Sequence, residues 1–220
     1  MRLLLAAAAA ALWTTAASAS PLSGEIGLVS DYRYRGVSLS DGNPALQGSL
    51  TLEHKGFYGT LWGSTLDRIG DPADSEIDLT AGYERNLAEW ISLDLSATRY
   101  LYPSSGGDDY SEATAAVTLT RGSAEATAGL GYVPRQRALR DNLYAFAGAR
   151  YALTGTPVTL VAGGGYERGA FDEVRRGGKR DWNIGAEIER GRGKFSLSLI
   201  GSDADGENGH ALVGAVALAW

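Results

Sequence analysis

Cysteine is absent from this 220-residue chain, which excludes disulfides, thiolate catalysis and cysteine-ligated zinc. Basic clusters are scarce: the formal net charge is −6, and this acidic balance argues against nucleic acid as a partner. Long apolar runs are missing too, because no stretch reaches the ~20 residues that a membrane-spanning helix needs. A helical membrane protein is therefore excluded. A β-barrel is not, since its strands alternate apolar and polar residues.

The first residues are typical of a secretory signal. Arg2 provides the positive charge, residues 3–13 form a short apolar core, and residues 17–19 (Ala-Ser-Ala) form a small-x-small cleavage site. An alanine-rich helix is the alternative, but no later segment would pack against it. We therefore predict a signal peptide at residues 1–19 and one exported domain at residues 20–220.

Nearly every segment after residue 22 alternates apolar and polar side chains. In residues 181–190 the apolar side chains share one face, and residues 75–84 and 90–98 repeat the pattern. Strict alternation is the signature of a β-strand with one apolar face. Most predicted strands have about ten residues, the length of a tilted membrane-crossing strand. They cover residues 24–35, 45–54, 57–66, 75–84, 90–101, 110–120, 123–133, 142–152, 157–166, 181–189, 194–201 and 211–220.

The links between these strands alternate in length. Residues 36–44 and 167–180 form long polar links, whereas residues 55–56, 121–122 and 190–193 form tight ones. Short turns at one end and longer loops at the other are typical of bacterial outer-membrane barrels. Closure is required because open strand edges lack hydrogen-bond partners in lipid. The predicted fold class is all-β: a transmembrane antiparallel up-and-down β-barrel of about 12 strands with a narrow lumen.

Two of the tight turns predict strand register. If residues 121–122 form a two-residue turn, Leu119 faces Ala124 and the apolar faces of both strands coincide. Pairing across residues 190–193 sets Glu189 opposite Lys194, a favourable cross-strand ion pair.

Aromatic residues are open to two interpretations. A turn at residues 55–56 directs Tyr58 and Trp62 into the lumen, where they could contact sugars or organic solutes; a one-residue shift would turn both toward lipid. Tyr32 and Tyr34 lie near a predicted strand end on the outward parity, as interfacial aromatic residues do.

A motif near the start of the predicted mature chain resembles a known family. Residues 30–52 read SDYRYRGVSLSDGNPALQGSLTL, which is similar to the S-[DN]-Y-x-[FY]-R-G-x-S…P-A-x-Q-G motif of the TorF-like porin family. Residues 57–64, 76–83 and 99–105 continue the similarity in spacing and residue type. The resemblance implies an outer-membrane barrel with porin activity and no defined substrate.

Strand parity places a set of charged residues, with Trp62, in the predicted lumen, where the charges avoid the ~2–4 kcal/mol that Arg or Lys costs at the lipid midplane. We hypothesise that excess carboxylates make the pore prefer cations; the alternative is that these charges merely pair across a wet interior. The candidate pore-lining residues are Asp31, Arg33, Arg35, Trp62, Glu76, Asp78, Asp94, Glu112, Arg150 and Glu187.

Partners follow from the same interpretation. Outer-membrane lipids would surround the barrel, and a final strand ending at Trp220 resembles the signal read by the barrel-insertion machinery. The basic residues at 175, 176, 179 and 180 (Arg, Arg, Lys, Arg) could contact lipopolysaccharide phosphates, or simply solvate a loop. Residues 203–208 match only part of a calcium-loop pattern. No metal or other cofactor is predicted.

Three functions remain open at this level. The first is a passive channel for small hydrophilic solutes in the bacterial outer membrane. The second is a closed barrel with a structural or surface-interaction role, and the third is an outer-membrane lipid-modifying enzyme. His54 and His210 lie at opposite ends of their strands, about 25 Å apart across the apolar band, and no G-x-S-x-G turn occurs. The sequence therefore gives no positive sign of catalysis.

Overall fold

The computed structural model describes residues 21–67, 74–103, 109–136, 139–172, 177–204 and 209–220. The predicted signal peptide at residues 1–19 lies outside these ranges, as do Arg175 and Arg176 and most of the calcium-like segment. Among the described residues, no helix is long and apolar enough to cross a membrane.

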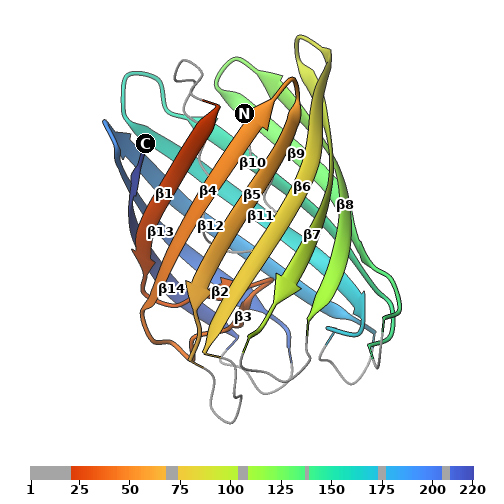
Figure 1. The fold of residues 1–220 in the computed structure, drawn as a ribbon. Helices are drawn as coiled ribbons and strands as arrows, with labels where there is room; N and C mark the ends of the chain where they lie inside the picture. The colour runs from red at the N-terminus through yellow and green to blue at the C-terminus, as the bar shows by residue number, and fades with distance from the viewer. Residues whose placement is uncertain (1–20, 68–73, 104–108, 137–138, 173–176, 205–208) are drawn as a thin grey trace.

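Twelve strands form a closed antiparallel barrel (Figure 1), which confirms the predicted fold class. A separate two-stranded hairpin, β2 (Arg33–Tyr34) and β3 (Val37–Ser38), follows the first barrel strand along the chain and precedes the second. The barrel strands are β1 (Leu22–Val29), β4 (Ala45–His54), β5 (Phe57–Thr65), β6 (Ser75–Ala88), β7 (Ile91–Leu101), β8 (Tyr110–Arg121), β9 (Ala124–Val133), β10 (Asn142–Ala152), β11 (Val158–Gly169), β12 (Lys179–Arg190), β13 (Gly193–Ser202) and β14 (His210–Ala219).

The first and last strands close the barrel, with Ile26 opposite Leu218. β1 begins and β14 ends at the same end, where the short turns lie, and the longer links gather at the opposite end (Figure 1). We call these the short-turn end and the long-loop end. The predicted sorting of the loops is therefore present in the structure.

Strand register matches the prediction at two turns and differs at a third. Glu189 lies opposite Lys194, and the turn at residues 55–56 directs Tyr58 and Trp62 into the lumen, both as predicted. Arg121 instead pairs with Ala124, so the turn consists of residues 122–123 and not 121–122. Leu119 then faces Ala126, a shift of two residues from the predicted partner. Because side chains alternate with period two, the shift leaves the apolar faces together.

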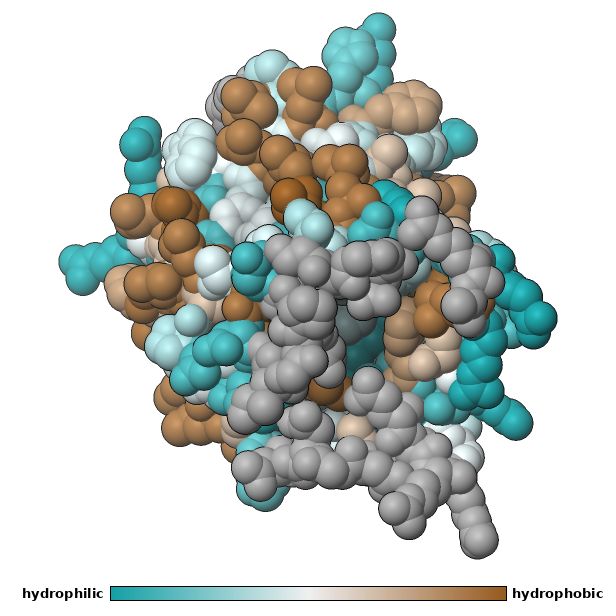
Figure 2. Space-filling model, turned by 60° about the horizontal axis from the view of Figure 1, so that its bottom comes forward, coloured by the Kyte–Doolittle hydropathy of each residue, from teal (hydrophilic) through white to brown (hydrophobic). Residues whose placement is uncertain are grey.

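The outer wall is apolar and the interior is polar. Ile184 and Leu212 point outward and are 58% and 66% exposed, whereas Glu76 and Glu112 are buried inside. Figure 2 looks toward the long-loop end and shows apolar side chains around the outside, with hydrophilic atoms visible in the hollow between the loops. An apolar surface that surrounds a polar interior is stable in lipid.

The lipid-facing wall gives a depth-dependent prediction. Leu61 is outward-facing at the centre of β5, and Leu52 is outward-facing near the short-turn end of β4. We expect Leu61→Arg to lower the free energy of unfolding by about 2–4 kcal/mol and Leu52→Arg by about 0–1 kcal/mol. Equilibrium urea unfolding in lipid vesicles measures both, and equal costs at the two depths would contradict the orientation.

Candidate pore constriction

The family-like motif folds into the barrel and does not extend the first strand. β1 ends at Val29, and residues 31–40, which we call the lumen hairpin, turn inward. The amide of Leu39 donates to the carbonyl of Tyr32 (2.7 Å), and the amide of Tyr32 donates to Ser40 Oγ (2.8 Å). The predicted strand 24–35 was therefore too long, because Tyr32 and its neighbours bond within the hairpin instead.

The hairpin turn depends on two residues with positive φ. Arg35 has φ +48° and Gly36 has φ +81°, the backbone of a two-residue turn that suits antiparallel strands. Gly36 also approaches the wall: an added Cβ would lie 2.6 Å from Ser202 Cβ and 2.7 Å from the carbonyl oxygen of Gly201. Only glycine fits both the turn and the contact, which explains the Arg-Gly step of the motif.

Arg35 anchors the lumen hairpin inside the barrel. Its side chain is 1% exposed, and Nη2 lies 2.6 Å from Glu112 Oε1 while Nη1 lies 2.5 Å from Glu167 Oε1. The guanidinium also lies 4.1 Å from the ring centre of Tyr144 and 4.8 Å from that of Tyr34. Carboxylates from β8 and β11 thus hold one cation, and the charge is compensated in the buried site.

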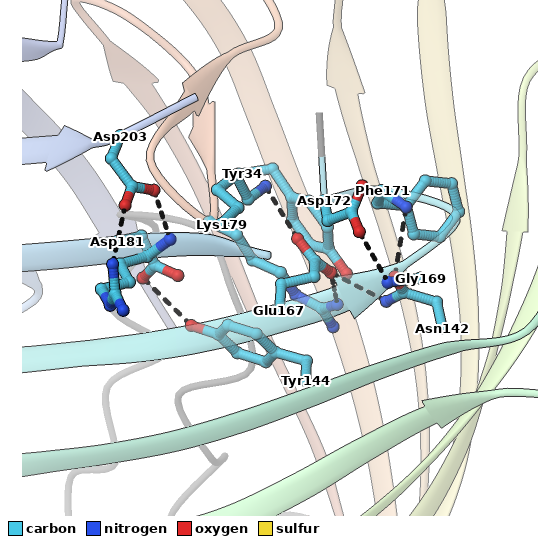
Figure 3. A network of polar contacts seen from close by, with 12 residues as sticks. Tyr34, Asn142, Tyr144, Glu167, Gly169, Phe171, Asp172, Lys179, Asp181 and Asp203 are labelled. Atoms are coloured by element: carbon cyan, nitrogen blue, oxygen red, sulfur yellow. Dashed lines mark hydrogen bonds and ion pairs between the residues drawn. The ribbon is translucent and has the colours of Figure 1, made fainter. Parts of the chain in front are cut away.

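Glu167 extends this network along the wall (Figure 3). Lys179 Nζ lies 2.7 Å from its Oε2, and Asn142 Nδ2 donates to its Oε1 (2.9 Å). Lys179 is only 3% exposed, so the structure corrects its assignment to a lipopolysaccharide-binding cluster. Arg180 does lie outside, 3.5 Å from Asp203. Adjacent strand positions point to opposite faces, which separates the two basic residues.

The hairpin itself carries a second ion pair. Arg33 Nε lies 2.5 Å from Asp31 Oδ2, and its Nη1 donates to the carbonyl of Gly36 (2.8 Å). Ser38 Oγ donates to Asp31 Oδ1 (2.5 Å). Arg33 and Asp31 therefore stabilise the hairpin internally, whereas Arg35 attaches it to the barrel.

Tyrosines connect the hairpin with β6 to β8. Tyr32 and Tyr102 donate hydroxyl hydrogens to Glu76 (2.9 and 2.8 Å), and Tyr34 donates to Glu112 (3.3 Å). Burial, with the Glu76 carboxylate nearby, raises the pKa of Tyr32 well above its ordinary value. Burial raises the pKa of Tyr34 as well, although Arg35 opposes that shift. Both hydroxyls therefore remain protonated donors.

Two predictions about aromatic residues have different outcomes. Tyr32 is 2% exposed and lies inside the barrel, so its interfacial assignment was wrong, as was that of Tyr34. Parity failed there because β1 ends before residue 30. Trp62 is buried on the inward face of β5, with its ring centre 5.5 Å from that of Tyr32. It packs against the hairpin.

On the other side of the hairpin, a cavity of about 90 Å³ adjoins β10 to β13. Its wall is built largely from small residues and a few polar ones. Two aromatic rings approach glycines of the neighbouring strands β11 and β9: an added Cβ at Gly165 would lie 2.2 Å from the Tyr144 hydroxyl, and one at Gly129 would lie 2.5 Å from Phe146 Cζ. These glycines let the rings lie along the wall, which leaves space beside the hairpin.

The structure places all ten candidate pore-lining residues inside the barrel but brings only some together. Asp31, Arg33 and Arg35 lie on the hairpin and not on a strand. Three ion pairs join members of the set: Asp31 with Arg33, Arg35 with Glu112, and Arg150 with Glu187. The remaining four are Trp62, Glu76, Asp78 and Asp94, which lie on β5, β6 and β7.

Several residues of the constriction were missed. Tyr100, Tyr144 and Asp181 share the inward parity of their strands and could have been found from it. Glu167 and Lys179 fell in a predicted loop, because β11 and β12 extend beyond the alternating segments. Parity therefore missed inward positions that lay beyond the predicted strand limits.

The Arg35 anchor predicts a local effect. Arg35→Gln leaves Glu112 without its cation, and removing one partner of a buried ion pair costs about 3–5 kcal/mol. We expect faster amide hydrogen exchange in residues 31–40 while the barrel strands stay protected. Arg180→Gln is the control, because an exposed ion pair contributes about 1 kcal/mol or less. Unchanged exchange in the hairpin of Arg35→Gln would contradict the anchoring role.

The barrel is similar to solved structures of outer-membrane proteins. The KdgM porin has a TM-score of 0.64 at 7% identity, covering 90% of this chain and 98% of that chain. An outer membrane channel from Pseudomonas putida F1 has a TM-score of 0.54 at 11% identity, covering 90% of this chain and 94% of that chain. LpxR from Salmonella typhimurium has a TM-score of 0.52 at 9% identity, covering 90% of this chain and 99% of that chain. At such low identity these likenesses show the fold alone. No curated protein matches the sequence significantly. The family model described as "Bacterial protein of unknown function (Gcw_chp)" matches residues 13–217, and the chain therefore belongs to the Gcw_chp family.

Proposed function

We propose that the protein is an outer-membrane channel through which small hydrophilic solutes diffuse passively beside the lumen hairpin. The observation that carries this proposal is the polar interior, which the hairpin narrows while a cavity remains along β10 to β13. The fold likeness to porins supports it, as does the resemblance of residues 30–52 to TorF-like porins.

The interior offers hydrogen-bonding groups along much of its wall. Threonine hydroxyls pair across neighbouring strands, with 2.9 Å between Thr51 and Thr60 and between Thr80 and Thr98. Such hydroxyls can replace part of a solute's hydration shell without fixing its charge. Uncharged hydroxyls of this kind suit the diffusion of hydrophilic molecules.

Fixed charge favours cations in this channel. Acidic side chains outnumber basic ones on the inward face, and a cleft lined mostly by one sign of charge concentrates counter-ions. The inward acids are Asp31, Glu25, Glu53, Glu76, Asp78, Glu84, Asp94, Glu112, Glu125, Glu167, Asp181, Glu187 and Glu189, against Arg33, Arg35, Arg150, Lys179 and Lys194.

Planar-bilayer recording of the purified protein tests the channel. We expect resolved current steps, and in a KCl gradient a reversal potential of the sign that K⁺ permeation produces. Replacing residues 33–38 with a Gly-Gly link should raise the conductance several-fold, since the hairpin occupies the lumen. Anion preference would contradict the charge argument.

A closed barrel with a structural or surface-interaction role is the second candidate. The buried Arg35 ion pairs favour it, because they hold the hairpin as a plug. If the protein is silent in bilayers and the hairpin-shortened variant conducts, this candidate replaces the channel. A lipid-modifying enzyme is the third, and it predicts altered lipid A after expression, measured by mass spectrometry.

A further inference from the structure

On the β10–β13 side of the lumen hairpin, one inward carboxylate forms no ion pair among the described residues. Four acids around it each have a basic partner within 2.7 Å. The pairs are Asp31 with Arg33 (2.5 Å), Glu112 with Arg35 (2.6 Å), Glu167 with Lys179 (2.7 Å) and Glu187 with Arg150 (2.5 Å). Asp181 forms no such pair among the described residues. Its charge is the one that this cluster leaves without an ion-pair partner.

Only one of the two carboxylate oxygens of Asp181 accepts a hydrogen bond from the described residues. The hydroxyl of Tyr144 donates to Oδ1 (3.0 Å; Figure 3), which fixes the carboxylate against the β10–β12 wall. Oδ2 is buried and has no hydrogen-bond partner within the described part of the chain, and the residue is only 9% exposed. An unsatisfied buried carboxylate oxygen is costly, so a cation that reaches it is bound favourably.

The surroundings of Asp181 fit an organic cation. Asp181 lines the 90 Å³ cavity, together with Phe146, Asn183 and Ser198. Arg33 and Arg35 border the cavity too, but their charges are already paired with Asp31 and with Glu112 and Glu167. The Phe146 ring, whose centre lies 5.7 Å from that of Tyr144, offers apolar surface to alkyl groups, whereas the Tyr144 ring already holds the Arg35 guanidinium 4.1 Å from its centre. The amide of Asn183 and the hydroxyl of Ser198 add hydrogen-bonding groups. A hydrated inorganic ion would not use the aromatic surface.

We propose that Asp181 and the adjoining cavity form a binding site for small organic cations that carry a primary ammonium or guanidinium group. The proposal deepens the channel function and rests on it, because it names a solute class that would pause beside the lumen hairpin. Gly36 lies at this site: a Cβ added there would be 3.1 Å from Asp181 Cβ. The hairpin tip therefore borders the bound cation.

A second tyrosine–aspartate pair, on another part of the barrel wall, provides a control for Asp181. The hydroxyl of Tyr58 donates to Asp94 Oδ2 (2.8 Å), its ring lies over Gly82, and Asp94 Oδ1 is buried without a partner among the described residues. The chemistry repeats that of Tyr144, Gly165 and Asp181. Asp94, however, does not line the cavity beside the hairpin. Asp94→Asn therefore removes an equivalent charge without touching the proposed site.

Binding of ethylammonium to the full-length barrel in detergent micelles tests the proposal by calorimetric titration. We expect saturable binding that Asp181→Asn weakens at least about tenfold, since the variant loses the charge-assisted hydrogen bond to the cation. Asn can still accept the Tyr144 hydrogen bond, so the fold is retained. Asp94→Asn should bind as the unmodified protein does. No saturable binding, or equal weakening by both variants, would overturn the site.

Bilayer recording separates the site from the channel. Ethylammonium should reduce the K⁺ current of the unmodified protein and of Asp94→Asn at similar concentrations, and Asp181→Asn should need about tenfold more. A silent barrel that still binds ethylammonium through Asp181 would refute the channel and support the site. If the barrel conducts and Asp181→Asn does not change the concentration at which ethylammonium blocks the current, the site is refuted and the channel is supported.

Discussion

Arg35 brings a permanent positive charge into the interior of the barrel, and that charge has to be compensated there. Glu112 and Glu167 provide the compensation from two strands, while the rings of Tyr34 and Tyr144 enclose the guanidinium. A buried cation with incomplete partners would be expelled with its hairpin, because the desolvation cost of an unpaired charge is large. The position of the hairpin, and with it the width of the lumen, depends on this cluster and on the tyrosine hydrogen bonds to Glu76 and Glu112.

Small residues on the inner wall provide the space that this arrangement needs. Gly131 lets the Glu112 side chain reach Arg35, since an added Cβ would lie 2.1 Å from Glu112 Oε1. Gly82 and Gly165 receive tyrosine rings in the same way. A barrel of this strand number has little interior volume. Rings laid against glycines, and a hairpin fixed on one side, divide that volume into a packed region and an open one.

Strand alternation was sufficient to predict the barrel and most inward positions, because one apolar and one polar face leave a single orientation for each strand. Glu76, Asp94 and Glu112 were found in this way. The hairpin could not be predicted from alternation, because residues 30–35 read equally well as the end of β1. Its contacts depend on Glu112 and Glu167, which are 77 and 132 residues from Arg35. Pairings at such separations leave no periodic signal in the sequence.

The same separations have a consequence for assembly. The lumen hairpin follows the first strand, yet its anchors come from β8 and β11, so the segment that is synthesised early finds its place late. Contacts of high sequence separation form slowly, because the intervening chain must be ordered first. Until β11 is in the wall, Arg35 has no complete set of partners. A nascent barrel therefore keeps a wide interior through most of its maturation and becomes narrow only near completion.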